Sequence, residues 1–329
     1  MQSRGNARSK LKVLTMLIML ICCMSLVSCS SGTDSAAVQT ASPEASAAAA
    51  EGTASAAPLQ TPGIQNLTFH SEALDQKMRL SIYLPVGYST EQHYPVLYLI
   101  HGYGGKETDM IAGLGLHLNA ERLDQAGQIH PLIIVSPQMD NSYGLNSSPT
   151  YAVNDPGDPL TTYNGMYEDY LVKDVVNYVD SHFSTIAERD SRYIGGISMG
   201  GFVSLHAALL HSDVYSRAGG HSPALFLDDW SSVGGEYGLI RFLYPTEAER
   251  QERDPLILAK DRDLRGLAVY LDCGEEDSYR FYEGAEQLYT LLKDKGVPVE
   301  YHLRAGKHDG EYWRAHLDEY LIFYAGRTN

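Results

Sequence analysis

Cysteine is scarce in this chain of 329 residues, and it is unevenly placed. Three of the four cysteines lie within the first 29 residues, which leaves Cys273 alone in the rest of the chain. A single thiol cannot close an intrachain disulfide, so the folded part must depend on its core for stability. The chain also has no H-E-x-x-H segment and no glycine-rich nucleotide loop, so the sequence predicts neither a metal nor another cofactor.

Basic residues are few as well. The chain has 25 Lys and Arg against 41 Asp and Glu, a formal net charge of −16. Because the phosphates of nucleic acids need cationic partners, this balance argues against a nucleic-acid partner. A neutral or weakly charged substrate is compatible with it.

Long hydrophobic runs are limited to residues 13–28, "VLTMLIMLICCMSLVS", after a start with four basic and no acidic residues. This run has the length of a signal-peptide core. It ends in "LVSC" at Leu26–Cys29, which resembles a bacterial lipobox. The resemblance implies that residues 1–29 are a lipoprotein signal peptide, cut before Cys29, and that the thiol of Cys29 is lipidated. An ordinary signal peptide or an uncleaved anchor is the alternative.

Residues 30–65 are composed mainly of Ala, Ser, Thr and Pro, with few large apolar side chains. Such a segment cannot bury enough surface to offset the entropy lost on ordering, so we expect a disordered linker. Together with the lipid it would hold an exported domain at the extracytoplasmic face of the cell membrane.

Residues 66–329 are long enough for one large α/β domain, and strand and helix patterns alternate along them. Two runs alternate apolar and polar residues, as an antiparallel pair does, and the other strand candidates are largely apolar, as buried parallel strands are. The predicted strands are 66–74, 77–85, 94–102, 131–137, 191–198, 217–225, 266–274 and 297–306. The predicted helices are 166–183, 200–212, 279–296 and 311–326. The order predicts about eight strands, mostly parallel, with helices on both faces, and resembles the α/β-hydrolase fold.

Two stretches interrupt this alternation, residues 138–165 and an insertion near 226–262. Both follow predicted strands, at the sheet edge where open α/β folds bind ligands, and long loops there are often functional. Their aromatic residues could stack sugars or aromatic acids, or could simply anchor the loops. These residues are Tyr143, Tyr151, Tyr163, Trp230 and Tyr237.

The segment "GISMG" at 196–200 matches G-x-S-x-G and joins a predicted strand to a predicted helix. A sharp turn there holds the serine in a strained conformation with its hydroxyl exposed, and crowding around it requires Gly196 and Gly200. The pattern predicts Ser198 as a nucleophile, beside the N-terminal amides of the following helix. The alternative is a tight strand–helix turn with an incidental serine.

A serine nucleophile needs a base and an orienting acid, which follow it along the chain in this fold. The segment "LDCGEED" offers Asp272, Glu275, Glu276 and Asp277. Asp272 falls within or at the end of a strand, whereas Asp277 lies on the loop beyond it, so we predict Asp277 as the acid. Capping of the next helix is the alternative role for Asp277.

Three histidines follow the acid. His302 falls inside a strand and His316 inside a helix, whereas His308 falls on the loop after the last strand. That position suits the base, so we predict His308 in this role. An ordinary surface histidine is the alternative.

The loop "HGYGG" at 101–105 has glycines that allow backbone N–H groups to turn inward. We predict an oxyanion hole formed by the N–H groups of Tyr103 and Met199. His101 is expected to brace this loop. His221 is expected to line the pocket or to cap its strand, without a catalytic part.

Together, "HGYGG", "GISMGG", "LDCGEED" and "GKHDGEYW" resemble the esterase D-like branch of the α/β-hydrolases over roughly 66–326. That group includes feruloyl, acetylxylan and tributyrin-type esterases, S-formylglutathione hydrolases and mycolyltransferases. The resemblance implies that Ser198, Asp277 and His308 are nucleophile, acid and base. The insertion near 226–262 and the pair Glu275–Glu276 depart from the family pattern.

The predicted function is therefore a serine carboxylesterase acting through an acyl-enzyme on a small-molecule or polysaccharide-linked ester, such as a feruloyl or acetyl ester. An acyltransferase of the mycolyltransferase type is the enzymatic alternative. A solute-binding lipoprotein without catalysis, or an inactive hydrolase used as an adhesion module, are the alternatives from other classes. The oligomeric state stays open.

Overall fold

The computed structural model describes residues 58–148, 163–227 and 237–327. Cys29, the predicted signal peptide and residues 30–57 of the predicted linker lie outside these residues, so those assignments stay predictions. The prediction of disorder is wrong for the end of the linker, because a strand begins at Gly63 and the Gln60 amide donates to the His182 carbonyl at 2.8 Å. Within the described ranges, no helix combines the length and the apolar character needed to cross a membrane.

Eight strands form one sheet in the order β1-β2-β4-β3-β5-β6-β7-β8. Their bounds are β1 Gly63–Ser71, β2 Gln76–Leu84, β3 Val96–Ile100, β4 Ile133–Pro137, β5 Arg192–Ile197, β6 Arg217–His221, β7 Ala268–Gly274 and β8 Val299–Arg304. β1 pairs antiparallel with β2, and β2 with β4, whereas every other pair is parallel. The predicted α/β-hydrolase architecture, about eight mostly parallel strands, is confirmed.

The burial of the strands varies with their place in the sheet. Every residue of β3, β4 and β5 is buried, and the apolar runs of β3 and β4 are typical of strands covered on both faces. β8, at the edge of the sheet, has no buried residue, and Glu300 and Leu303 are exposed. The strand predicted over 297–306 is therefore less buried than the sequence analysis expects, because it has a neighbouring strand on one side only.

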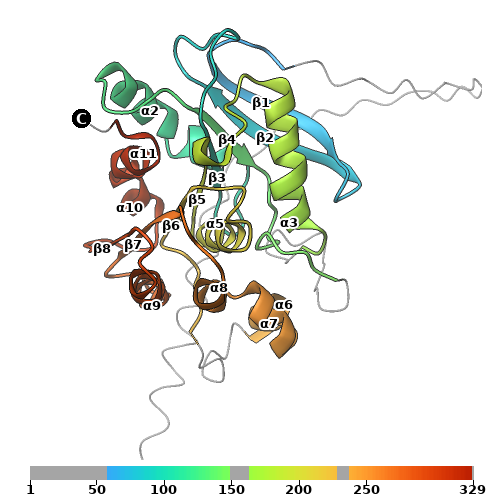
Figure 1. Cartoon of the computed structure of the whole chain (residues 1–329), viewed down its shortest axis with the longest axis vertical. Helices are drawn as coiled ribbons and strands as arrows, with labels where there is room; N and C mark the ends of the chain where they lie inside the picture. The colour runs from blue at the N-terminus through green and yellow to red at the C-terminus, as the bar shows by residue number, and fades with distance from the viewer. Residues whose placement is uncertain (1–57, 149–162, 228–236, 328–329) are drawn as a thin grey trace, which may run out of the picture. The chain divides into compact units, whose positions relative to one another are not determined.

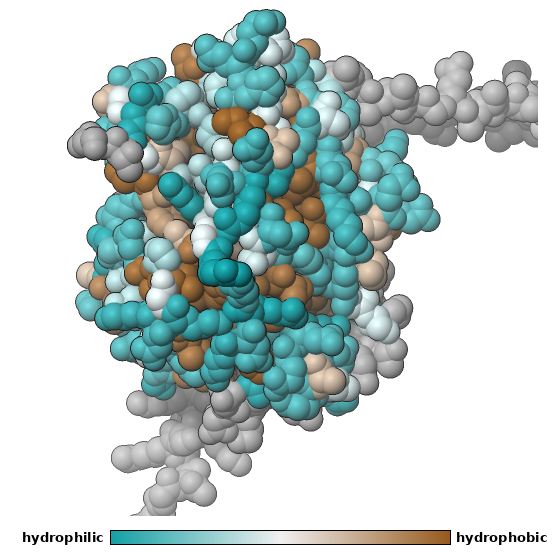
Figure 2. Space-filling model, in the orientation of Figure 1, coloured by the Kyte–Doolittle hydropathy of each residue, from teal (hydrophilic) through white to brown (hydrophobic). Residues whose placement is uncertain are grey.

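Helical segments cover both faces of the sheet (Figure 1). One face packs against η3 Tyr170–Val175, α4 Val176–His182, α5 Met199–Leu210, α8 Pro255–Asp261 and α9 Phe281–Asp294. The other face packs against η1 Asp109–Gly113, α2 Leu116–Gln125, α10 Gly310–Ala315 and α11 Leu317–Ala325. The surface seen in Figure 2 is mainly hydrophilic, with hydrophobic residues in small groups.

Several boundaries differ from the predictions. The helix predicted over 311–326 is broken at His316 into α10 and α11, because His316 leaves the helical conformation (φ −111°, ψ 7°). β6 ends at His221 rather than at 225, because Ser222 turns the chain with φ at 49°. The helix predicted over 166–183 is formed by α3 Tyr167–Asp169, η3 and α4 in succession.

The insertion near 226–262 has more regular structure than its irregular pattern predicts. Its described part forms three short helices, α6 Tyr237–Leu243, α7 Glu247–Arg253 and α8. Thr246 caps α7 by accepting the Glu249 N–H, and Asp254 caps α8, in which Pro255 is the first residue. These capping residues are the sequence signal that a search for apolar periodicity misses.

Candidate active site

Ser198 lies in the sharp turn between β5 and α5, where its backbone has φ 53° and ψ −116°. This left-handed φ is costly for a residue with a side chain, and the surrounding packing maintains it. A Cβ on Gly196 would lie 2.5 Å from the Gly200 backbone, and a Cβ on Gly200 would lie 2.1 Å from the carbonyl oxygen of Ile100. The crowding inferred from the glycine pattern is therefore present, and only glycine fits on either side of the turn.

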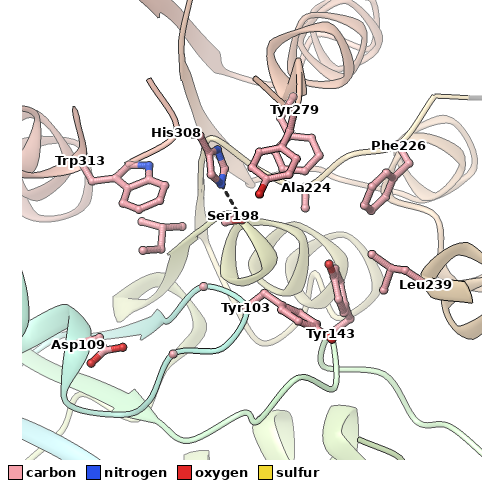
Figure 3. Close-up of a pocket in the computed structure, with 14 residues that line it drawn as sticks. Tyr103, Asp109, Tyr143, Ser198, Ala224, Phe226, Leu239, Tyr279, His308 and Trp313 are labelled. Carbon is pink, nitrogen blue, oxygen red and sulfur yellow. Dashed lines mark hydrogen bonds between the residues drawn. The ribbon is translucent and has the colours of Figure 1, made fainter. Parts of the chain in front are cut away.

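The structure brings Ser198, His308 and Asp277 into one hydrogen-bonded chain (Figure 3). His308 Nδ1 lies 2.8 Å from Asp277 Oδ2, and His308 Nε2 lies 2.9 Å from Ser198 Oγ. Because the carboxylate can only accept, Nδ1 carries the proton and Nε2 of the neutral ring accepts from the serine hydroxyl. This is the arrangement by which an imidazole withdraws a proton from a hydroxyl.

The sheet topology explains how residues so distant in sequence meet. Ser198 follows β5, Asp277 follows β7 and His308 follows β8, and these strands run parallel. The carboxyl ends of parallel strands lie at the same edge, which is where this class of fold binds ligands. The Asp277 side chain is fully buried there, and its Oδ1 accepts the Tyr279 N–H at 2.8 Å.

Asp272, the alternative acid, belongs to a separate buried cluster. Its Oδ1 lies 2.8 Å from Nδ1 of His221, and its Oδ2 accepts the hydroxyl hydrogens of Tyr312 and Tyr320 at 2.8 Å each. Burial, and next the charge of Asp272, raise the pKa of Tyr320 well above its ordinary value. The sequence analysis expected His221 to line the pocket or to cap its strand. Its ring does neither and pairs with Asp272 instead.

The cluster around Asp272 still supports the turn that holds the serine. The carbonyl of His221 accepts the Ser198 N–H at 2.9 Å, and the carbonyl of Asp272 accepts the Ser222 N–H at 2.7 Å. Ser222 Oγ in turn accepts the indole N–H of Trp313 at 3.2 Å. No sequence signal identified the Asp272–His221 pair, because the residues are 51 positions apart and meet only through the register of β6 and β7.

The remaining candidates lie away from this chain of contacts. Glu275 and Glu276 are exposed, unlike Asp277. His302 lies on β8 at 3.3 Å from Glu300, and His316 lies 3.4 Å from a carboxylate oxygen of Glu319. Neither histidine is among the residues that line the cavity at Ser198.

The loop after β3 presents the Gly102–Tyr103 peptide to the same cavity. The carbonyl oxygen of Gly102 accepts the N–H of His101 Nδ1 at 2.8 Å and the backbone N–H of Gly105 at 3.0 Å. Because the C=O and N–H of one peptide point in opposite directions, these two bonds fix the direction of the Tyr103 N–H. Met199 is the first residue of α5, so its N–H has no acceptor within the helix.

His101 is fixed in one tautomer by its two partners. Its Nε2 accepts the Met139 N–H at 3.0 Å, so the ring proton resides on Nδ1, toward Gly102. Burial lowers the pKa of His101 below its ordinary value, which keeps the ring neutral. The expectation that His101 braces this loop agrees with these contacts.

A cavity of about 540 Å³ opens at Ser198, a size typical of small-molecule sites. Its lining is mainly aromatic and aliphatic. The lining residues are Gly102, Tyr103, Gly105, Asp109, Tyr143, Ile197, Ser198, Ala224, Phe226, Leu239, Tyr279, Phe281, His308 and Trp313. Among the aromatic residues singled out from sequence, Tyr143 lines this cavity, and Tyr163 packs against the core instead.

Three rings surround His308, a feature that the sequence did not reveal. The ring centroids of Tyr279, Phe281 and Trp313 lie 5.0, 5.3 and 5.1 Å from that of His308, at steep interplanar angles. They hold the imidazole in place and cover it from solvent. The aromatic flanks of "EEDSYRFY" and "HDGEYW" were the available signal.

Some predicted residues cannot be placed. Tyr151 and Trp230 lie outside the described residues, as does the side chain of Tyr237. Within the described ranges, no group of three or more His, Cys, Asp or Glu side chains is arranged to hold a metal ion.

A family model described as "Putative esterase" matches residues 71–324 of the chain. An acetyl esterase of Caldicellulosiruptor saccharolyticus is 21% identical over 274 residues, which cover 77% of this chain and 95% of that protein. An endo-1,4-beta-xylanase/feruloyl esterase of Xylanibacter ruminicola is 28% identical over 263 residues, 78% of this chain. The chain spans only 30% of the length of that second protein.

Solved structures agree on the fold. A ferulic acid esterase superposes with a TM-score of 0.64 at 24% identity, over 79% of this chain and 96% of its own. An S-formylglutathione hydrolase from Agrobacterium tumefaciens superposes with a TM-score of 0.61 at 18% identity, over 79% and 94%. At these identities the likeness establishes the fold.

Proposed function

The chain belongs to the esterase family, and from that premise we propose that it hydrolyses carboxylic esters through an acyl-enzyme on Ser198, with His308 as base and Asp277 as orienting acid. The hydrogen-bonded chain of these three side chains, at the wall of an apolar cavity, is the observation that carries the proposal.

His308 Nε2 takes the proton of the Ser198 hydroxyl as Oγ attacks the ester carbonyl carbon. The carbonyl oxygen becomes an oxyanion, which the N–H groups of Met199 and Tyr103 stabilise. Collapse of this intermediate breaks the bond to the alcohol oxygen, which receives the proton from His308. A water molecule then loses a proton to His308 and attacks the acyl-enzyme, releasing the acid and regenerating Ser198.

Asp277 supports both steps. Its buried carboxylate holds Nδ1–H of His308, so the ring presents Nε2 to the serine, and its charge stabilises the imidazolium formed in each proton transfer. The Tyr279 N–H fixes the carboxylate in turn.

We propose feruloyl or acetyl esters of polysaccharides as the substrate class. Two relatives carry the names acetyl esterase and feruloyl esterase, and the cavity is lined mainly by apolar and aromatic side chains. His308 is the only Lys, Arg or His among the lining residues of the described chain, which favours a neutral ester over an anionic one.

We propose further that the protein is exported and is anchored to the membrane through a lipid on Cys29. The apolar run and "LVSC" at its end support this proposal. Mass spectrometry of the mature N-terminus tests it: a diacylglyceryl cysteine is expected, and an intact residue 1 or cleavage elsewhere contradicts it.

The esterase proposal is tested by hydrolysis of p-nitrophenyl acetate and butanoate by the full chain and by Ser198→Ala. We expect kcat/KM to fall by at least about a thousandfold, as removal of a nucleophile does in other serine hydrolases. Ser181→Ala, at an exposed serine of α4, is the matched control and should keep the full rate. Equal rates for Ser198→Ala and the wild type would refute the mechanism, and acyl transfer to an added alcohol at the expense of hydrolysis would indicate an acyltransferase.

A further inference from the structure

We propose that two described residues of the insertion, Phe226 at its start and Leu239 on α6, form the acyl-selecting wall of the cavity. The inference rests on the proposed esterase function and adds a role for a segment that the family pattern does not explain. Both side chains line the cavity that Ser198 lines.

The cavity has two chemically different sides. Figure 3 shows Phe226 and Leu239 on one side of Ser198, and Asp109 and Trp313 on the other. Among the described residues, the first side continues through Ala224 and has no charged side chain. The second side includes the Asp109 carboxylate and the backbone of Gly102 and Gly105. Burial of a hydrocarbon acyl group is most favourable against the apolar side. A polyol such as a sugar requires hydrogen-bond acceptors and donors, which the second side provides.

The Phe226 side of this wall is held firmly. Its ring packs edge-on against Phe281 at 5.7 Å, and the Ala224 N–H is bonded to the Ser198 carbonyl at 3.0 Å. A Cβ on Gly284 of α9 would lie 2.6 Å from the Leu225 carbonyl oxygen, so the helix and this segment are in close contact. Phe226 therefore keeps a fixed position relative to the nucleophile.

Leu239 is held by the rest of α6. Ile240, Phe242 and Leu243 of this helix are buried, whereas Leu239 is only partly buried and faces the cavity. Arg253, at the end of α7, donates from its guanidinium to the Leu243 carbonyl at 3.2 Å. The buried residues secure the helix, so the size of residue 239 can change without loss of its anchorage.

The insertion is also tied to the helix that begins at the nucleophile. His206 of α5 faces the Arg253 carbonyl with Nδ1 at 2.9 Å and a Glu168 carboxylate oxygen with Nε2 at 3.2 Å. The buried ring therefore bridges the end of α7 and the Glu168 side chain. This link joins α7 to α5, and the wall and the serine belong to one rigid assembly.

The experiment measures kcat/KM for two ester series. In the first, the alcohol is always p-nitrophenol and the acyl group is acetyl, hexanoyl or 3-phenylpropanoyl. In the second, the acyl group is always acetyl and the alcohol is ethanol, phenol or 2-naphthol. The variants are Leu239→Trp, which fills the space, and Leu239→Ala, which removes the contact. Glu252→Ala, at an exposed residue of α7 in the same insertion that is not among the lining residues, is the control.

We expect both Leu239 variants to lower kcat/KM for hexanoyl and 3-phenylpropanoyl esters by about tenfold, because one or two methylene contacts have effects of this size. Acetyl esters should stay within about threefold of wild type with every alcohol, because an acetyl group ends one bond beyond the reacting carbon. Glu252→Ala should match the wild type throughout. Stoichiometric labelling of Ser198 by diisopropyl fluorophosphate and a thermal melt verify that each variant is folded.

Three results would overturn the inference. They are an equal change in every acyl ester, no change in any, and a change that follows the alcohol series. If the wild type hydrolyses none of these esters, the esterase proposal fails together with this one. If the wild type is active and Ser198→Ala is not, the esterase proposal stands. If both Leu239 variants then change kcat/KM by the same factor for every acyl group, only the proposal for the acyl-selecting wall is overturned.

Discussion

His101 offers a test of how the oxyanion hole is built, because its two ring nitrogens have separable tasks. Nδ1–H holds the Gly102 carbonyl and thereby the direction of the Tyr103 N–H, whereas Nε2 accepts the buried Met139 N–H. An asparagine amide nitrogen lies near the position of Nδ1, and a glutamine amide near that of Nε2. His101→Asn should therefore keep the first contact, and His101→Gln should keep the second.

The sizes of the two effects follow from the contacts. Loss of the Nδ1 bond leaves the Gly105 N–H as the remaining donor to Gly102, so the peptide is loosened rather than released. One neutral hydrogen bond contributes about 1 kcal/mol, which corresponds to roughly a fivefold to tenfold fall in kcat. The upper limit is the 10²- to 10³-fold loss that follows removal of an oxyanion donor. An unsatisfied Met139 N–H in the core would cost about 1–3 kcal/mol of stability.

The assay measures kcat and KM with p-nitrophenyl acetate beside the free energy of unfolding from urea titration. His101→Gln should lose kcat with little change in KM and should be the more stable variant. His101→Asn should keep more of the kcat and should lose about 1–3 kcal/mol of unfolding free energy. If kcat and stability fall together in both variants, or if kcat is higher in the glutamine variant, the peptide-orientation argument is wrong.

Two further predictions concern the acidic residues. Asp277→Asn should lower kcat by about 10³- to 10⁴-fold, because an amide can donate to Nδ1 and favours the wrong tautomer of His308; a loss below tenfold in single-turnover measurements would contradict this. Burial raises the pKa of Glu168, but hydrogen bonds and charges from His206 and His211 outweigh it and lower the value from 4.5 to about 2. Because this folded-state pKa is depressed, Glu168 contributes about 3 kcal/mol above pH 4.5, and that contribution is lost as the pH falls toward 2. Urea titrations between pH 4.5 and 2 should show a smaller loss of unfolding free energy for Glu168→Gln than for the wild type. The same dependence of unfolding free energy on pH in both proteins would refute the assignment.

The order of strands and helices could be predicted from sequence because each reflects a local periodicity. Every one of the eight strands and the nucleophile helix α5 were anticipated within a few residues. α2 and the helices of the insertion were not anticipated. Most residues of α2, "LHLNAERLDQ", are polar, and α6, α7 and α8 are too short for a period to emerge. In α7 and α8 the caps, rather than the apolar residues, carry the signal.

The choice of Ser198, Asp277 and His308 as partners also came from sequence, since each falls on the turn or loop after a predicted strand. The amino-acid order determined that these residues reach one edge of the sheet, because parallel strands bring their carboxyl ends together. Only the tertiary structure decided that Asp272 turns away to His221, that three rings surround His308, and that Phe226 and Leu239 line the cavity. These contacts depend on strand register and side-chain packing between distant segments, which no local pattern encodes.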